Sequence, residues 1–260
     1  MSTRYLQLQH PSRTGLTSGD GRSIWNGTST YRGKSWDISS CGTGATCLSP
    51  ATAINKQFYR TGDPQISYGC GYSELSEGFG DAMFSEIMHQ NGIKSERTLA
   101  VISFPGGYCV TVRTAPNLLR PSHFFNHLKQ GNIRRLKGAV DLFIKRQIAN
   151  RTWPKPSRSV DRYRYMLEMV SDTFARMCAR FESEYIFCWL DWDGDNILAD
   201  GSIVDYGSVR QFGMFHHDYR FDDTDRWSTT ILEQRLKGRE TVQVFAQIAD
   251  YLGTGNKNEN

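Results

Sequence analysis

Residues 99–113 read LAVISFPGGYCVTVR, and this stretch decides the fold class that we predict. Two runs rich in β-branched and aromatic residues flank the turn sequence Pro105-Gly106-Gly107. Such a pattern is typical of a β-hairpin, because glycine adopts the positive backbone angles that tight turns need. We therefore predict two antiparallel strands here, over 99–104 and 108–113.

Strands and helices are expected to segregate on the two sides of this hairpin. The upstream pattern predicts short strands at 23–27 and 35–40, and a helix at 76–90 that ends at Gly92. Downstream, apolar residues recur every three or four positions, which predicts helices over 122–150, 160–184 and 229–252. Strands followed by helices indicate an α+β protein with two unlike lobes, a strand-rich lobe over 1–120 and a helical lobe over 121–260.

The composition excludes several classes of protein. The 260-residue chain has 38% hydrophobic and 22% charged residues, which excludes a disordered chain, a collagen and a coiled coil. No apolar run approaches the roughly 20 residues that span a bilayer, and the N-terminus lacks the apolar core of a secretory signal. The six cysteines form no CxxC pair, so reduced thiols are expected. We expect a soluble, cytoplasmic protein with no membrane partner.

Charge is spread evenly along most of the chain. The net charge is only +4, with acidic and basic residues interspersed, so a nucleic-acid partner is not expected. Residues 133–164 are the exception, because basic residues dominate there. This segment is either a solvated helix face with its loop or a surface for an acidic partner.

Carboxylates gather in residues 191–207, DWDGDNILADGSIVDYG, between two apolar runs. Oxygen ligands of this kind bind Mg²⁺ or Ca²⁺. An EF-hand calcium loop does not fit, since its glycine and glutamate positions hold Asn196 and Ser202.

A phosphoryl-transfer site fits the same segment better. Two short apolar strands around a turn at Asp200-Gly201 would bring Asn196 and Asp205 close together, and Asp195 precedes them. An asparagine and an aspartate hold Mg²⁺ against phosphates in such sites, beside a catalytic carboxylate. An acidic surface hairpin without a ligand is the structural alternative.

Short motifs in a fixed order carry a resemblance to a known family. The first, Gly19-Asp20-Gly21-Arg22, is a glycine turn of the kind that covers phosphates. The others are Gly27, Trp36-Asp37-Ile38, Gly42-Thr43-Gly44, Phe84-Ser85-Glu86 with His89, Gly92-Ile93, Val112-Arg113, Ala115-Pro116, Arg120, Gly194-Asp195-Asn196 and Val204-Asp205-Tyr206-Gly207. Over about residues 18–210 the chain resembles the selenoprotein O family, whose members have a protein-kinase-like fold and transfer AMP to proteins.

The resemblance implies a protein-kinase-like fold whose N-lobe covers ATP and whose C-lobe carries the catalytic and metal-binding loops. Asp195 would be the catalytic aspartate, and Asn196 and Asp205 would hold Mg²⁺, with Mn²⁺ as an alternative. The family binds ATP reversed, so that the α-phosphorus faces the acceptor hydroxyl. Arg113 and Arg120 match two arginines of its γ-phosphate pocket. The remaining positions that the resemblance assigns to ATP binding are Gly19, Gly21, Arg22 and Asp81.

The chain departs from the family at the lysine that neutralises phosphate charge. This lysine falls at Cys41, and its partner glutamate falls at Asp81. Lys34 and Lys56 are the candidates to supply the charge instead. Trp189 replaces the histidine before the catalytic loop. The chain also ends before the family's C-terminal region, so we expect a minimal member or a piece of a longer one.

Three functions are compatible with these residues. The first is ATP- and Mg²⁺-dependent transfer of AMP to Ser, Thr or Tyr hydroxyls of a protein substrate. The second, suggested by Cys41, is a degenerate kinase-like pseudoenzyme that serves as a nucleotide-binding or interaction module. The third is a small-molecule kinase or nucleotidyltransferase, since a fold does not fix the acceptor.

A second cluster of possible metal ligands is His216-His217-Asp218 with its neighbouring aspartates. Histidine and carboxylate side chains bind Zn²⁺ or Mn²⁺, but we expect a solvated loop at this position.

Overall fold

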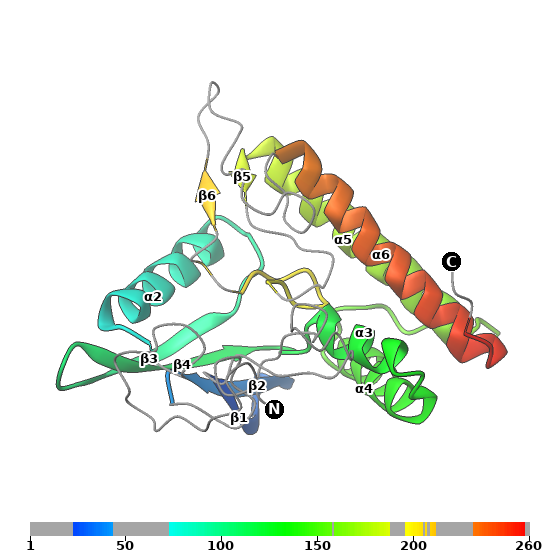
Figure 1. Ribbon diagram of the computed structural model, residues 1–260, viewed down its shortest axis with the longest axis horizontal. Helices are drawn as coiled ribbons and strands as arrows, with labels where there is room; N and C mark the ends of the chain where they lie inside the picture. The colour runs from blue at the N-terminus through cyan, green and yellow to red at the C-terminus, as the bar shows by residue number, and fades with distance from the viewer. Residues whose placement is uncertain are drawn as a thin grey trace. The chain divides into compact units, whose positions relative to one another are not determined.

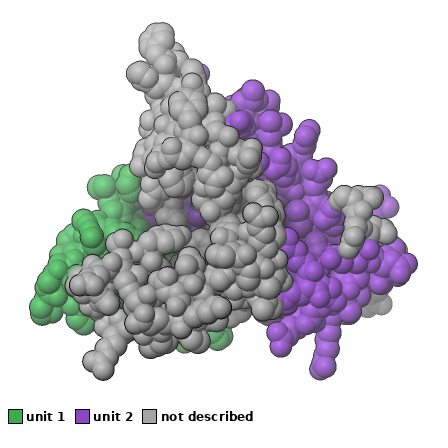
Figure 2. Space-filling view, in the orientation of Figure 1, with its two compact units in different colours: residues 1–118 green, residues 119–260 purple. Residues whose placement is uncertain are grey.

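The computed structural model describes residues 23–43, 73–157, 159–187, 196–204, 206, 209–211 and 231–257. The chain divides into two compact units, Met1–Leu118 (unit 1) and Leu119–Asn260 (unit 2), which Figure 2 shows in green and purple. Unit 1 contains an antiparallel sheet with a helix, and unit 2 is mainly helical (Figure 1). The predicted α+β class is therefore confirmed. The protein-kinase-like arrangement and the roles of the two lobes stay predictions.

A four-stranded sheet forms the centre of unit 1. Its strands are β1 (Ser23–Tyr31), β2 (Lys34–Cys41), β3 (Arg97–Phe104) and β4 (Tyr108–Ala115), in the order β1-β2-β4-β3. The hairpin predicted from residues 99–113 is confirmed as β3 and β4, with Gly106 and Gly107 at φ 89° and 82° in its turn. β1 continues past its predicted end, because the chain reverses at Arg32 and Gly33. Gly27, where the predicted strand ended, lies at a β-bulge within β1.

One face of this sheet is buried. In an antiparallel pair, residues directly opposite each other point to the same side. Cys41 lies opposite Thr111 and Ser39 lies opposite Arg113, so these four side chains share a face. All four are buried, and burial alternates along most of β2 and β4. This alternation is the pattern of strands that pack on one side only.

The helix α2 (Leu75–Gln90) covers this face. A Cβ atom at Gly78 would lie 2.5 Å from Cys109 Sγ and 3.1 Å from Thr111 Oγ1, so the helix backbone approaches β4 closely. The helix ends near the predicted glycine. Gly92 has φ 69°, and the N–H groups of Gly92 and Ile93 donate to carbonyls of the last turn, the pattern of a Schellman cap.

Replacing Gly78 with alanine is expected to destabilise the protein by about 1–3 kcal/mol, because the added methyl group overlaps the Cys109 sulfur. Gly80 is the matched control on the same helix, since an added Cβ there meets no atom within 4 Å. Gly80→Ala should instead stabilise by about 0.5–1 kcal/mol, as alanine favours a helix interior. Urea unfolding followed by circular dichroism measures both changes. A Gly78→Ala protein at least as stable as the wild type would contradict the close packing of α2.

Unit 2 contains the helices α3 (Pro121–Lys129), α4 (Ile133–Ala149), α5 (Arg162–Ser183) and α6 (Ile231–Thr254). The single helix predicted over 122–150 is wrong. The chain breaks at Gly131, whose φ of 63° is incompatible with a continuing α-helix. Asn132 then caps α4, because its side-chain oxygen accepts a hydrogen bond of 3.1 Å from the Arg135 N–H.

Aromatic rings join the four helices of unit 2 into one core. Phe124 of α3 contacts Phe143 of α4 and Phe245 of α6, with ring centroids 5.6 Å apart in both pairs. Phe174 of α5 also contacts Phe245, and α5 lies alongside α6 (Figure 1). A short antiparallel pair, β5 (Ile186–Phe187) with β6 (Arg210–Gln211), also belongs to unit 2.

Three of the six cysteines, Cys41, Cys109 and Cys178, are buried free thiols, as expected; the other three lie outside the described residues. Burial, with a smaller effect of Glu182, raises the pKa of Cys178 to about 11. This thiol therefore stays protonated at neutral pH. Among the helices described, none is long and apolar enough to cross a membrane.

Candidate nucleotide and metal site

A small hairpin in unit 2 carries the candidate metal ligand Asn196. Ile197, the next residue, forms an antiparallel bridge with Ile203. In this antiparallel pairing, Val204 on the returning strand lies opposite Asn196. The chain therefore enters and leaves the hairpin at the same end, as the phosphoryl-transfer interpretation requires.

The turn of the hairpin lies at the predicted position. Gly201 has φ 77°, and the Asp200 carboxylate accepts a hydrogen bond of 3.1 Å from the Ser202 N–H. A Cβ atom at Gly201 would lie 2.8 Å from Thr173 Cγ2, so the turn rests directly against α5. Glycine is required here both for the backbone angle and for this close approach.

The hairpin is held by the core of unit 2. Its apolar side chains are at most 2% exposed, namely Ile197, Leu198, Ile203 and Val204. The Ala199 N–H donates to the Leu119 carbonyl at 2.8 Å, which ties the hairpin to the chain before α3. A hairpin anchored in this way holds the residue at its open end, Asn196, in a fixed place.

Of the two predicted metal ligands, Asn196 and Asp205, the structure describes only Asn196. Asn196 is buried, with 7% of its surface exposed, and its side-chain amide supplies an oxygen of the type that Mg²⁺ binds. Asp195, the predicted catalytic residue, and Asp205, the second predicted ligand, lie outside the described residues. The convergence of Asn196 with Asp205 therefore stays a prediction.

Arg120 is the N-cap of α3 and is buried. Its backbone N–H donates to His123 Nδ1 at 2.9 Å, while the His123 N–H donates to the Arg120 carbonyl at 3.0 Å. This reciprocal pair fixes the backbone from which the guanidinium extends, and requires that His123 Nδ1 carries no proton.

Arg113 occupies the buried face of the unit 1 sheet, on β4. Its guanidinium forms an ion pair of 3.0 Å with Glu96 and donates to the Ser23 hydroxyl at 2.8 Å. The side chains of Arg113 and Glu96 are only 8% and 2% exposed. Glu96 therefore neutralises much of the positive charge that the resemblance assigns to phosphate binding.

Cys41 lies on β2 and Asp81 lies on α2. These are the positions at which the resemblance places the family's lysine–glutamate pair. Cys41 ends β2 on the face that α2 covers, and Asp81 lies one turn after Gly78 on that helix. Both side chains are buried. Lys34 begins β2, seven residues from Cys41, and is exposed, so about 23 Å of extended strand separates the two. Lys34 is thus a poor source of the missing charge.

Other predicted positions lie outside the described residues. These are Gly19, Gly21, Arg22, Lys56, Trp189 and the group around His216, His217 and Asp218. Within the ranges that are described, no group of three or more His, Cys, Asp or Glu side chains has the geometry to hold a metal ion.

Sequence reasoning missed the buried polar partners in unit 1. Nothing in the spacing indicated that Glu96 would pair with Arg113. Asp37, noted only as part of a motif, is a buried carboxylate that accepts hydrogen bonds from Trp25 Nε1, Thr28 Oγ1 and the Leu118 N–H, each at 3.0–3.2 Å. Its position in a strand of polar residues was the only available signal.

Comparison with known proteins identifies relatives over most of the chain. The chain is similar to proteins named protein nucleotidyltransferase YdiU. The protein from Clostridium perfringens (strain SM101 / Type A) is 29% identical over 217 residues, which cover 80% of this chain and 39% of that protein. The one from Pseudoalteromonas translucida is 26% identical over 225 residues, 80% of this chain and 42% of that protein. The one from Corynebacterium glutamicum (strain R) is 27% identical over 210 residues, 74% and 43% respectively.

These relatives do not carry the name selenoprotein O, but they support the predicted resemblance to the family that joins selenoprotein O and YdiU proteins. The chain spans about two fifths of the length of the YdiU relatives. No protein-family model matches the chain.

Proposed function

We propose that this protein transfers AMP from ATP to a hydroxyl group of a protein substrate. The observation that carries the proposal is the buried hairpin that holds Asn196, in a chain whose relatives are named as protein nucleotidyltransferases. The sheet with α2 in unit 1 and the hairpin in unit 2 each carry residues that the resemblance assigns to the nucleotide or its metal ion.

The reaction assigns each predicted residue one task. The acceptor oxygen forms a bond to the α-phosphorus, the bond from that phosphorus to its bridging oxygen breaks, and pyrophosphate leaves. The hydroxyl proton passes to the carboxylate of Asp195. Arg113 and Arg120 bind the γ-phosphate, for which a planar guanidinium is well suited.

The chemistry of the donor set fits a magnesium ion. Asn196 and Asp205 supply an amide and a carboxylate oxygen, the ligands that Mg²⁺ shares with nucleotide phosphates. Mg²⁺ would supply charge neutralisation for the phosphates. The buried hairpin would hold the Asn196 oxygen in position before the nucleotide binds, so little reorganisation is needed.

A nucleotide-binding protein without transferase activity is the second candidate. Cys41, a buried neutral thiol, occupies the strand position of the phosphate-pairing lysine. The pairing of Arg113 with Glu96 also favours this candidate, because it leaves less positive charge for phosphate.

Two isotopic labels test the proposal. With α-³²P-labelled ATP and Mg²⁺, label should enter a protein acceptor, whereas γ-³²P-labelled ATP should transfer none. Transfer of the γ-label would indicate a kinase instead. Binding of ATP without transfer of either label would favour the second candidate.

Asp205→Ala is expected to weaken ATP·Mg²⁺ binding by roughly 100-fold, because one of two protein ligands of the metal is lost. Isothermal titration calorimetry measures the affinity. The matched control is Asp200→Asn in the turn of the same hairpin. It removes the same charge but keeps an oxygen that accepts from the Ser202 N–H, so binding should be unchanged. Normal binding by Asp205→Ala would show that the metal site is misplaced.

A further inference from the structure

Positive charge is concentrated in one part of unit 2. Residues 131–164 contain ten basic and two acidic residues, a net charge of +8 against +4 for the whole chain. This segment comprises α4, the following loop and the start of α5. The rest of the chain is therefore net negative, so the concentration is not a general property of the surface.

Three basic residues of α4 and one aspartate form a line along its exposed side. Arg134, Lys137, Asp141 and Lys145 are separated by three, four and four positions, a spacing that places them on one face of a helix. The opposite face is buried through Leu136, Val140, Phe143 and Ile144. The line is thus fixed by the packing of the helix.

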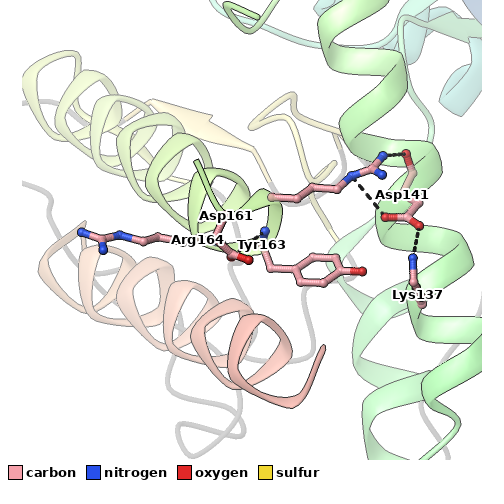
Figure 3. Close-up of polar contacts among 6 residues, drawn as sticks. Lys137, Asp141, Asp161, Tyr163 and Arg164 are labelled. Atoms are coloured by element: carbon pink, nitrogen blue, oxygen red, sulfur yellow. Dashed lines mark hydrogen bonds and ion pairs between the residues drawn. The ribbon is translucent and has the colours of Figure 1, made fainter. Parts of the chain in front are cut away.

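One carboxylate joins α5 to this line. Lys137 Nζ lies 2.6 Å from one oxygen of Asp141, and Arg162 Nε lies 3.3 Å from the other (Figure 3). Arg162 begins α5, where Asp161 caps the helix by accepting from the N–H groups of Tyr163 and Arg164. We call Arg134, Lys137, Lys145 and Arg162 the basic stripe. Of its four cations, two pair with the Asp141 carboxylate, namely Lys137 and Arg162.

On the exposed side of α5, three arginines each have a carboxylate partner of their own. Arg164 pairs with Glu168, Arg176 with Asp172 and Arg180 with Glu184, so signs alternate there as on an ordinary solvated helix. Arg134 and Lys145 are exposed and form no ion pair with any residue that the structure describes. A line of four cations with one carboxylate among them is typical of a surface that meets an anionic partner.

We propose that the basic stripe binds an acidic segment of a partner protein. Arg134 and Lys145 are eleven residues apart, about 16 Å along the helix axis. An extended peptide covers this distance with about five residues. A run of five or six acidic residues therefore matches the stripe. This inference goes beyond the proposed transferase activity and does not depend on it.

The surroundings of the stripe favour a protein over a nucleic acid or a membrane. Ile133, Leu142 and Val160 are 38–47% exposed and adjoin the charged residues in sequence, which suits apolar side chains of a peptide. Among the described residues of 131–164, no exposed aromatic side chain is available for stacking on bases or for insertion into lipid. Trp153 is 4% exposed, and Lys137 lies over the ring of the half-buried Tyr163.

Fluorescence anisotropy with a labelled hexaglutamate peptide tests the proposal on the full chain at 50 mM salt. Arg134→Gln/Lys145→Gln removes two charges that do not contact Asp141. Arg32→Gln/Lys94→Gln, at exposed positions of unit 1, removes the same charge elsewhere. The stripe variant should bind roughly fivefold more weakly, with an unchanged melting temperature, and the control should bind within twofold of wild type.

Three results would overturn the proposal. The first is no binding of hexaglutamate by the wild-type chain. The second is equal weakening in both variants, because the effect would then reflect net charge alone. The third is tighter binding of oligothymidylate with six phosphates, or of vesicles containing anionic lipid, than of hexaglutamate, because the stripe would then serve a different anion.

Discussion

Replacing Glu96 with alanine is expected to lower the free energy of unfolding by about 3–5 kcal/mol, because it removes the carboxylate that pairs with the buried Arg113 guanidinium. The Ser23 hydroxyl would remain as a partner of Arg113, but a neutral oxygen does not compensate a buried positive charge. Urea denaturation, analysed by linear extrapolation, measures the change.

Two further variants separate the buried charge from general effects. Glu86→Gln removes a carboxylate that pairs with Arg97 at the surface, where 51% of the Glu86 side chain is exposed, so no measurable change is expected. Arg113→Met/Glu96→Leu removes both buried charges and should recover most of the stability lost in Glu96→Ala. If Glu96→Ala unfolds at the same urea concentration as Glu86→Gln, the buried ion pair does not stabilise unit 1.

Replacing Cys41 with lysine, together with Asp81→Glu, is expected to raise the rate of AMP transfer by ~10²–10³-fold. The new ammonium would be introduced on the sheet face that α2 covers, and the longer carboxylate would extend toward it from the helix. The phosphate charge would then be neutralised as the resemblance implies. Incorporation of α-labelled AMP into protein measures the rate.

Cys41→Met controls for the change of side-chain size at this buried strand position, and it should leave the rate unchanged. The Lys/Glu variant should also be less stable than the wild type, because a charge enters a position that is only 4% exposed. An unchanged rate in a folded Lys/Glu variant would show that another cation already neutralises the phosphates, or that no transfer occurs.

The local features predicted well are those that the sequence encodes within a few residues. The hairpin of β3 and β4 follows from two β-rich runs around adjacent glycines, and the end of α2 follows from Gly92. The turn at Asp200-Gly201 was likewise predictable, because both the side-chain acceptor and the positive φ belong to adjacent residues.

The features that were missed have two causes. In one, two local signals in the sequence conflict; in the other, the residues that interact are far apart in the sequence. The apolar periodicity predicted one helix through Gly131 and Asn132. The glycine instead marks the end of α3, and the asparagine caps the start of α4. The pairing of Arg113 with Glu96 joins residues 17 positions apart across a sheet register that no local pattern specifies. A buried partner of this kind becomes visible only after the strands have been paired.

The approach of Gly201 to Thr173 makes the candidate metal site dependent on a residue that has no chemical part in it. A larger side chain at Thr173 would push the turn away from α5, and the displacement would reach Asn196 through the rigid hairpin. Genetic screens for loss of function should therefore recover bulky substitutions at Thr173, which a search limited to ligand-binding residues would discard as neutral.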